Sequence, residues 1–223
     1  MSRTANPNRA ANPVFIVLEG VEGAGKSTQA KRLVAWLERS GAAVESVREP
    51  GGVALSEAIR GLLLDSAAVP ARVELLLLLA ARAALVEERL RPALDSGKMV
   101  VADRYDLSTL AYQVHGRGLP EAEVRALNAF ATGGVRPDLT IVLDVPVELG
   151  AARRARRRPD RIERAGSEFH ARVAGAYRLL ARSEPGVALV DASGSAAAVH
   201  EAVVELVRLR FPETFPGAPG STG

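Results

Sequence analysis

The sequence contains no cysteine and only three histidines in its 223 residues. Without thiols the chain can form neither disulfide bonds nor thiolate metal sites, and three histidines are few for a zinc centre. Lysine and arginine together number 29 against 26 aspartates and glutamates, a net charge of only +3. The chain therefore lacks the strong basic bias of a dedicated nucleic-acid-binding protein, and any basic function must be local.

Long apolar runs are also missing. The first 13 residues, MSRTANPNRAANP, carry no apolar segment of the kind found in a secretory signal. The richest apolar run, residues 75–81, stops at Arg82 and is far shorter than the roughly 20 residues that cross a bilayer. We therefore predict a cytoplasmic protein with no membrane partner.

The two ends of the chain differ in composition from the part between them. Residues 1–12 and 212–223 are rich in Pro, Gly, Asn, Ser and Thr, so we expect a disordered N-terminal extension and a disordered tail. Hydrophobic residues make up 48% of the chain, enough for a substantial core, and no repeat or linker interrupts residues 13–211. We predict that these residues form one domain.

Short apolar runs alternate with longer amphipathic segments along this domain. The short runs are rich in β-branched residues, as strands buried on both faces should be, and cover residues 14–18, 43–47, 99–102, 140–143 and 187–190. The amphipathic segments cover residues 27–39, 71–94, 121–131, 147–157, 168–181 and 196–209. This order predicts an α/β fold with a five-stranded parallel sheet, helices on both faces, and ligands beyond the carboxyl ends of the strands.

A glycine-rich stretch, LEGVEGAGKST, follows the first predicted strand and opens the first predicted helix. From Gly20 to Ser27 it fits the phosphate-binding loop, in which glycines let backbone N–H groups converge on phosphate oxygens. Lys26 should reach the β- and γ-phosphates, and Ser27 should ligate Mg²⁺. A plain glycine-rich turn would not require a lysine and a hydroxyl at these positions. We predict a nucleoside triphosphate site formed by Gly20, Val21, Glu22, Gly23, Ala24, Gly25, Lys26, Ser27 and Thr28.

Three arginines outside this loop indicate a second anion site. Arg48 opens the turn REPGG, Arg82 interrupts an apolar helix, and Arg104 comes directly after the third predicted strand. A charge within an apolar helix is costly unless it meets an anion, although Arg82 could instead face the surface with its stem over apolar neighbours. Asp103, beside Arg104, is placed to hold Mg²⁺ or its waters. We expect the three arginines to receive a second phosphate group, which a motor or switch GTPase does not need.

The basic run RRARRRPDRIER, residues 153–164, has three possible uses. A nucleic-acid patch would carry interleaved aromatic residues for stacking, and none occurs before Phe169. A solvated helix face would need fewer arginines. A mobile lid would close over the triphosphate and deliver an arginine to the transferring phosphoryl group. Composition alone leaves the three open, but together with the phosphate loop it favours a lid over about residues 153–166.

Six segments occur in the order found in thymidylate kinases: FIVLEGVEGAGKST, REPGG, AAR, DRYDLSTLAYQ, RPDLTIVLDV and DRIE. From Phe15 to about Val190 the chain therefore resembles this family, in the bacterial pattern in which the lid supplies the arginine. The resemblance implies a three-layer P-loop kinase fold and transfer of the γ-phosphoryl group of ATP to dTMP, which gives dTDP and ADP in dTTP synthesis. It also implies Mg²⁺ as cofactor and a homodimer, without a nucleic-acid partner.

The resemblance also implies roles for single residues. Glu22 would face the sugar of the acceptor nucleotide near its 3′-hydroxyl, Tyr112 would pack near the deoxyribose, and Thr109 would lie near the thymine. The implied acceptor residues are Glu22, Arg48, Pro50, Leu78, Arg82, Arg104, Ser108, Thr109, Tyr112 and Gln113. The implied catalytic residues are Lys26, Asp103, Arg104, Arg153, Arg157 and Arg158, with Arg161 as a further phosphate ligand.

Two features depart from the family pattern. Leu78 stands where the family commonly has a phenylalanine that stacks on thymine, so base discrimination should be weaker by about 1 kcal/mol. Val47 and Val53 flank REPGG at positions where hydroxyl residues are frequent. These changes affect secondary contacts rather than the chemistry.

Two alternative functions share part of this pattern. Another nucleoside monophosphate kinase or a deoxynucleoside kinase would use the same loop and lid, although a deoxynucleoside kinase would not need three arginines for an acceptor phosphate. A nucleotide-gated binding protein would bind ATP without transferring its phosphoryl group. Transfer to a monophosphate needs no general base, because the acceptor phosphate is already an anionic nucleophile.

Overall fold

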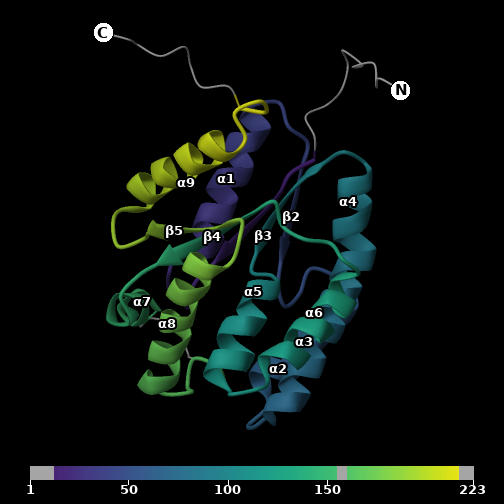
Figure 1. Ribbon diagram of the computed structural model, residues 1–223, viewed down its shortest axis with the longest axis vertical. Coiled ribbons are helices and arrows are strands. Elements are labelled where there is room, and N and C mark those ends of the chain that lie inside the picture. The colour runs from purple at the N-terminus through teal and green to yellow at the C-terminus, as the bar shows by residue number, and fades with distance from the viewer. Residues whose placement is uncertain (1–12, 155–159, 216–223) are drawn as a thin grey trace.

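Figure 1 shows the computed structural model, which describes residues 13–154 and 160–215. A parallel sheet lies at its centre, with helices packed against both faces. Among the helices in these ranges, none combines the length and the apolarity that a membrane span requires.

The five strands run parallel in the order β2-β3-β1-β4-β5. They are β1 (Phe15–Glu19), β2 (Val44–Arg48), β3 (Met99–Asp103), β4 (Leu139–Asp144) and β5 (Val187–Asp191). Each lies within one residue of its predicted bounds. The central strands β1, β3 and β4 are buried on both faces and leave continuous apolar runs in the sequence, whereas the edge strands β2 and β5 are buried only in part. The predicted α/β fold with a five-stranded parallel sheet is confirmed.

The helices come between the strands. They are α1 (Lys26–Arg39), α2 (Ala54–Asp65), α3 (Ala71–Leu85), α4 (Arg91–Asp95), α5 (Asp106–Thr109), α6 (Glu121–Thr132), α7 (Val147–Arg154), α8 (Ser167–Ser183) and α9 (Ala196–Arg210), with π-helical segments η1 (Val86–Leu90) and η2 (Leu110–Gly116). Successive β1 side chains join different apolar clusters: Ile16 packs in the cluster that holds Leu33 of α1, and Val17 in the cluster that holds Leu85 of α3. The alternating side chains of the central strand therefore need a helical layer on each face.

Several helical segments differ from the prediction: α5 and η2 were not predicted, and one predicted helix is described only in part. The helix predicted over residues 71–94 is divided into α3, η1 and α4, because Pro92 has no N–H to donate and the turn before it widens. The short helix α2 was missed, although Leu55, Ile59 and Leu62 have helical spacing. The helix predicted to end at residue 157 is described as far as residue 154, and the next five residues lie outside the described ranges.

The expected C-terminal tail also needs a correction. Residues 212–215 form a turn rather than a disordered segment, and Phe215 is buried. Its ring centroid lies 5.0 Å from that of Trp36 on α1. An aromatic side chain that buries its area against the core can fix a turn whose composition favours disorder.

Candidate active site

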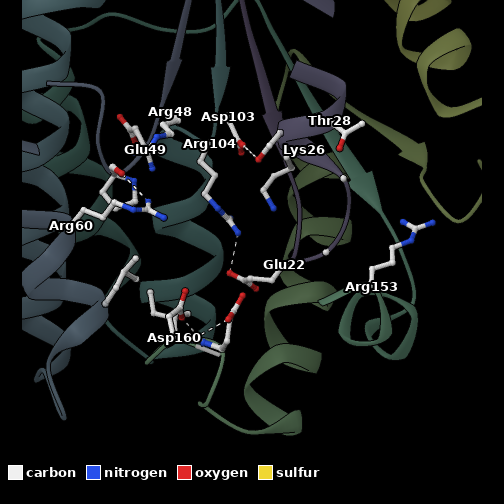
Figure 2. Close-up of a pocket in the computed structure, with 17 residues that line it drawn as sticks. Glu22, Lys26, Thr28, Arg48, Glu49, Arg60, Asp103, Arg104, Arg153 and Asp160 are labelled. Atoms are coloured by element: carbon white, nitrogen blue, oxygen red, sulfur yellow. Dashed lines mark hydrogen bonds and ion pairs between the residues drawn. The ribbon is translucent and has the colours of Figure 1, made fainter. Parts of the chain in front are cut away.

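A cavity of about 620 Å³ lies at the carboxyl ends of β1, β2 and β3 (Figure 2). Its walls come from the β1–α1 loop, the segment that leads from β2 into α2, the end of β3, α7 and the residues before α8. The structure brings Lys26, Arg48 and Arg104 to this one cavity. We refer to it as the central pocket.

Glycines allow the β1–α1 loop to lie close to its neighbours. The backbone φ angles of Gly20, Gly23 and Gly25 are 131°, 78° and 94°, values that residues other than glycine rarely adopt. A β-carbon on Gly23 would lie 2.1 Å from the carbonyl oxygen of Gly150 in α7, and one on Gly20 would lie 2.5 Å from that of Leu143. The loop can therefore take this path only with glycine at these positions.

Lys26 is buried beneath this loop. Its Nζ donates to the carbonyl oxygens of Gly20 and Val21 at 3.0 and 2.8 Å. Burial and the charge of Arg104 lower the Lys26 pKa to about 8, although the Glu22 carboxylate opposes this shift. Charged phosphate oxygens would bind the ammonium more strongly than these neutral carbonyls do.

Ser27 and Asp103 lie in contact, because the first turn of α1 meets the end of β3. The Ser27 hydroxyl donates to the Asp103 carboxylate. Such an oxygen pair suits Mg²⁺, which takes one or two protein ligands and completes its coordination with waters and substrate phosphates. Within residues 13–154 and 160–215, no group of three or more His, Cys, Asp or Glu side chains could hold a metal ion. The residues therefore fit an ion that arrives with the nucleotide.

Arg104 and Glu22 form an ion pair inside the central pocket (Figure 2). Arg104 Nη2 lies 2.9 Å from Glu22 Oε1, and the Tyr112 hydroxyl donates to the same oxygen at 2.7 Å. Burial raises the Glu22 pKa, but the charges of Arg104 and Lys26 outweigh it and bring that pKa down to about 2. The Arg104 backbone has a φ of 76°, a left-handed conformation that is costly for a residue with a side chain.

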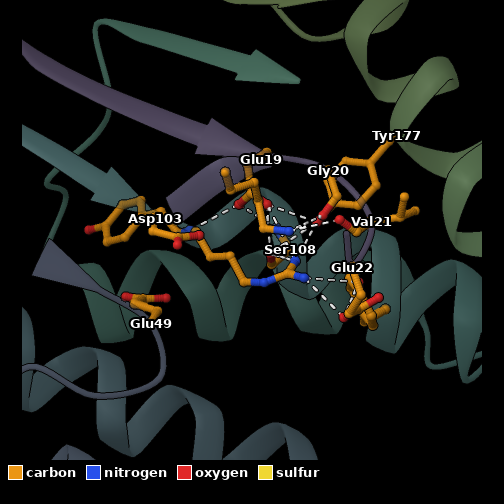
Figure 3. A network of polar contacts seen from close by, with 12 residues as sticks. Glu19, Gly20, Val21, Glu22, Glu49, Asp103, Ser108 and Tyr177 are labelled. Carbon is orange, nitrogen blue, oxygen red and sulfur yellow. Dashed lines mark hydrogen bonds and ion pairs between the residues drawn. The ribbon is translucent and has the colours of Figure 1, made fainter. Parts of the chain in front are cut away.

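Glu19, for which the sequence predicted no role, is fully buried at the end of β1 (Figure 3). Its Oε1 accepts from the backbone N–H groups of Tyr105 and Ser108 at 2.9 and 3.0 Å. Its Oε2 accepts from the hydroxyls of Ser108 and Tyr177 at 2.7 and 2.8 Å. Glu19 thus fixes the start of α5 and places Ser108. A carboxylate that directly follows a wholly apolar strand was the available signal.

Two more arginines line the central pocket from the side of β2 and α2. Arg48 is half exposed and pairs with Glu57 at 2.7 Å. Arg60 donates from Nη1 to the carbonyl oxygen of Pro50 at 2.9 Å, and burial together with the charge of Arg48 lowers its pKa. Arg60 was missed because the helix that carries it was not predicted.

Arg82 is only 2% exposed, so the alternative that it faces the surface is wrong. Its Nη2 lies 2.6 Å from Glu49 Oε2, and its Nη1 donates to Thr109 Oγ1 at 2.8 Å and Asn128 Oδ1 at 2.6 Å. Its guanidinium also donates to the carbonyl oxygen of Tyr105. Arg82 therefore meets a carboxylate of the protein and does not line the central pocket with Arg48 and Arg104.

The comparisons with known proteins agree with this geometry. The family model described as "Thymidylate kinase" matches residues 18–203. A thymidylate kinase from Synechococcus sp. strain JA-3-3Ab is 45% identical over 91% of this chain and 99% of its own length. The chain belongs to the thymidylate kinase family. The predicted activity, that of an ATP-dependent dTMP kinase, is confirmed.

Two further members of the thymidylate kinase family extend this comparison. The thymidylate kinase of Solidesulfovibrio magneticus is 46% identical over 85% of this chain and 96% of its own length. The crystal structure of thymidylate kinase from Ehrlichia chaffeensis is 28% identical and superposes with a TM-score of 0.75, covering 88% of this chain and 100% of that one. Sequence and fold therefore lead to the same family.

In this thymidylate kinase, the residues predicted near the thymine lie behind the wall of the central pocket. Thr109 and Gln113 are both buried, and Gln113 donates to Glu74 of α3 at 2.8 Å. Leu78 is half-buried in a small apolar cluster with residues of α2 such as Ile59. Pro50, by contrast, lines the pocket.

The predicted lid arginines divide between described and undescribed residues. Arg153 in α7 lines the central pocket, and its guanidinium donates to the carbonyl oxygens of Ala192 at 3.0 Å and Ser193 at 3.2 Å. Arg157 and Arg158 lie outside the described ranges. Arg153 thus links α7 to the loop that follows β5.

Arg161 lies behind the pocket rather than in it. Its Nη1 is 2.7 Å from Glu74, and its Nε donates to the carbonyl oxygen of Leu63 at 2.7 Å. Arg117 pairs with the same glutamate at 3.2 Å, and these partners lower the Glu74 pKa against the effect of burial. Arg161 therefore ties the end of the predicted lid to α2 and α3.

Proposed function

We propose that this thymidylate kinase aligns ATP and dTMP in the central pocket and transfers the γ-phosphoryl group between them, giving dTDP and ADP in dTTP synthesis. The observation that carries this proposal is the position of Glu22 and Arg104. Glu22 belongs to the phosphate loop and Arg104 directly follows β3, and their charged groups lie 2.9 Å apart. Donor and acceptor phosphates bound to these two elements would therefore be neighbours.

The donor would bind along the β1–α1 loop. Its phosphate oxygens would accept hydrogen bonds from the backbone N–H groups of the loop and from the ammonium group of Lys26. To reach them, the ammonium group would give up its hydrogen bonds to the carbonyl oxygens of Gly20 and Val21. Ser27 and Asp103 would hold Mg²⁺, which neutralises charge on the phosphates. Arg153, Arg157 and Arg158 of the lid would add a cation to the transferring group.

The acceptor phosphate would bind Arg104, Arg48 and Arg60, the arginines of the central pocket opposite the loop. Because this phosphate is already an anionic nucleophile, these residues need only align it and neutralise the charge between two anions. Tyr112, whose hydroxyl reaches Glu22, would pack near the deoxyribose.

Arg82 belongs at the base end of this acceptor site. Its guanidinium is occupied by Glu49, Thr109 and Asn128, so it is not available to the phosphate. With Leu78 and Gln113 it would shape the space for thymine. Arg161, held by Glu74, would support the lid and act on phosphate only if that ion pair opened.

The homodimer implied by the resemblance has a candidate surface on α2, α3 and α6, of which α3 packs against both others (Figure 1). These helices expose large apolar side chains: Phe130 is 87% exposed, Leu62 and Leu76 are each 57% exposed, and Val73 and Leu127 lie beside them on α3 and α6. An exposed apolar surface on adjacent helices is typical of a subunit interface. The cytoplasmic location expected from the sequence remains part of this proposal.

Phe130→Asp should convert the dimer to a monomer in light scattering after size-exclusion chromatography, because a charge would enter the buried interface. Leu209→Asp on α9, at a side chain that is 70% exposed, is the matched control and should leave the mass unchanged. A wild-type monomer at micromolar concentration would contradict the proposed dimer.

The function is tested by measuring ADP formation from ATP and Mg²⁺ with dTMP, dUMP, dCMP, dAMP, dGMP and thymidine supplied separately. Turnover with dTMP above all others supports the proposal. Preference for another monophosphate or for thymidine would reassign the acceptor, and ATP binding without turnover would indicate a nucleotide-gated binding protein.

Arg104→Ala tests the acceptor side of the same assay. We expect a raised KM for dTMP and a kcat lower by about a hundredfold, because the variant removes a buried cation from the transferring charge. The KM for ATP should change little. Values of both constants for dTMP close to those of the wild type would mean that the acceptor site is wrongly placed.

A further inference from the structure

Glu22 has one carboxylate oxygen that the network around Arg104 leaves unused. Both Arg104 and Tyr112 donate to Oε1. Oε2 is buried and has no hydrogen-bond partner among the described residues. Since a buried carboxylate oxygen without a donor is unfavourable, the second oxygen calls for a group that can supply one.

His170 of α8 is the side chain placed to do so. Its Nδ1 lies 3.8 Å from Glu22 Oε2, and its Nε2 lies 3.1 Å from the backbone carbonyl oxygen of Glu163. A carbonyl oxygen only accepts, so Nε2 carries the ring proton of neutral His170. Nδ1 then presents a lone pair to a carboxylate oxygen, and two acceptors do not approach to hydrogen-bond distance.

We propose that His170 is a positioning residue for Glu22: with a second proton on Nδ1, taken from solvent, it donates to Oε2 and holds the carboxylate against the acceptor sugar. The inference rests on the proposed function, because it assumes that dTMP binds beside Glu22. His170 lies in a buried position and is fixed on its other side by the Glu163 carbonyl, so its ring is held on this line.

Acceptor binding explains why the second proton matters. In this structure, the charges of Arg104 and Lys26 stabilise the Glu22 carboxylate. Bound phosphates draw both cations to themselves, and Glu22 then needs another donor. Protonated His170 supplies it, and its charge also offsets part of the negative charge of the nucleotide.

The charged groups around Glu22 are of both signs. Those that line the central pocket with Glu22 are Lys26, Arg48, Glu49, Arg60, Asp103, Arg104, Arg153, Asp160 and Glu163. A bound nucleotide adds negative charge to this set. Binding of dTMP and protonation of His170 therefore support each other.

Two substitutions test the contributions of the two ring nitrogens one at a time. In His170→Gln the side-chain amide can replace Nε2 toward the Glu163 carbonyl but offers no donor at the Nδ1 position. In His170→Asn the amide replaces Nδ1 toward Glu22. The KM for dTMP of His170→Gln, divided by that of the wild type, should be about tenfold at pH 6 and should fall as the pH rises. His170→Asn should keep a KM within about threefold of the pH 6 wild type.

The controls distinguish positioning from a structural role. His200→Gln on α9, on the other face of the sheet, should give a KM ratio of one at every pH, and the melting temperature of each variant checks folding. With 3′-deoxy-dTMP, which lacks the hydroxyl that Glu22 would hold, the His170→Gln ratio should stay near one. An equal ratio for both acceptors, or a dTMP ratio that does not change with pH, overturns the inference.

The same assay keeps the two proposals apart. Wild-type turnover with dTMP reports on the proposed function, and the ratio of KM values reports on His170. Turnover with a flat ratio of one would remove the inference and leave the function standing. Absence of turnover with dTMP would remove both.

Discussion

The two halves of the central pocket are built on different principles. The donor half is a backbone structure: glycines with positive φ angles bring the β1–α1 loop against β4 and α7, and one lysine lies beneath it. The acceptor half is a set of charged side chains that already pair with one another, Arg104 with Glu22 and Arg48 with Glu57, and behind them Arg82 pairs with Glu49. A local motif can specify the first half, whereas the second requires residues from distant parts of the chain to meet.

The largest effect should come from the donor half. Lys26→Ala should lower kcat by about a thousandfold, because it removes a buried cation from the phosphates at the moment of transfer. Single-turnover measurements with saturating ATP and dTMP give this rate. A loss below tenfold would mean that the backbone N–H groups suffice and that the lysine serves the fold.

In the acceptor half, a paired charge should matter for folding as well as for binding. Arg82→Met should lower the free energy of unfolding by about 3 kcal/mol, because it leaves the Glu49 carboxylate buried without a partner. Urea denaturation measures the change. The double variant Arg82→Met/Glu49→Gln should recover part of the loss, and a double variant as unstable as the single one would contradict this account.

The stability of the fold at acid pH should also depend on a paired charge, the carboxylate of Glu22. The Glu22 pKa is about 2 in the folded protein against an ordinary value of 4.5, so its contribution to stability is complete above pH 4.5 and is lost as the pH falls toward 2. The change amounts to about 3 kcal/mol. Glu22→Gln should flatten this part of the stability curve, as chemical denaturation at several pH values would show. An unchanged slope would mean that other carboxylates determine acid unfolding.

The smallest effect should concern the base. Leu78→Phe should improve discrimination of dTMP over dUMP by about fivefold, since an aromatic ring adds stacking worth about 1 kcal/mol. The ratio of kcat/KM for the two acceptors measures it, with Leu209→Phe on α9, at a side chain that is 70% exposed, as the control. Equal effects of the two variants would show that this position does not contact the base.

The same division explains what the sequence could predict. The phosphate loop and the five strands follow from short segments whose spacing constrains their geometry. Arg82 was predicted to need an anion, but its partner lies 33 residues away, and no local pattern shows that Glu49 is buried beside it. Arg60 was missed because α2, the helix that carries it, was not predicted. Glu19 was missed because a single carboxylate after a predicted strand has many possible uses.

One contact in the donor half, between the phosphate loop and α7, leaves no room for a side chain. Gly23 and Gly150 approach so closely that a β-carbon on either would collide with the backbone of the other segment. The phosphate loop and α7, the helix that leads into the predicted lid, therefore touch backbone to backbone. A side chain introduced at either glycine would therefore force the phosphate loop and the helix apart.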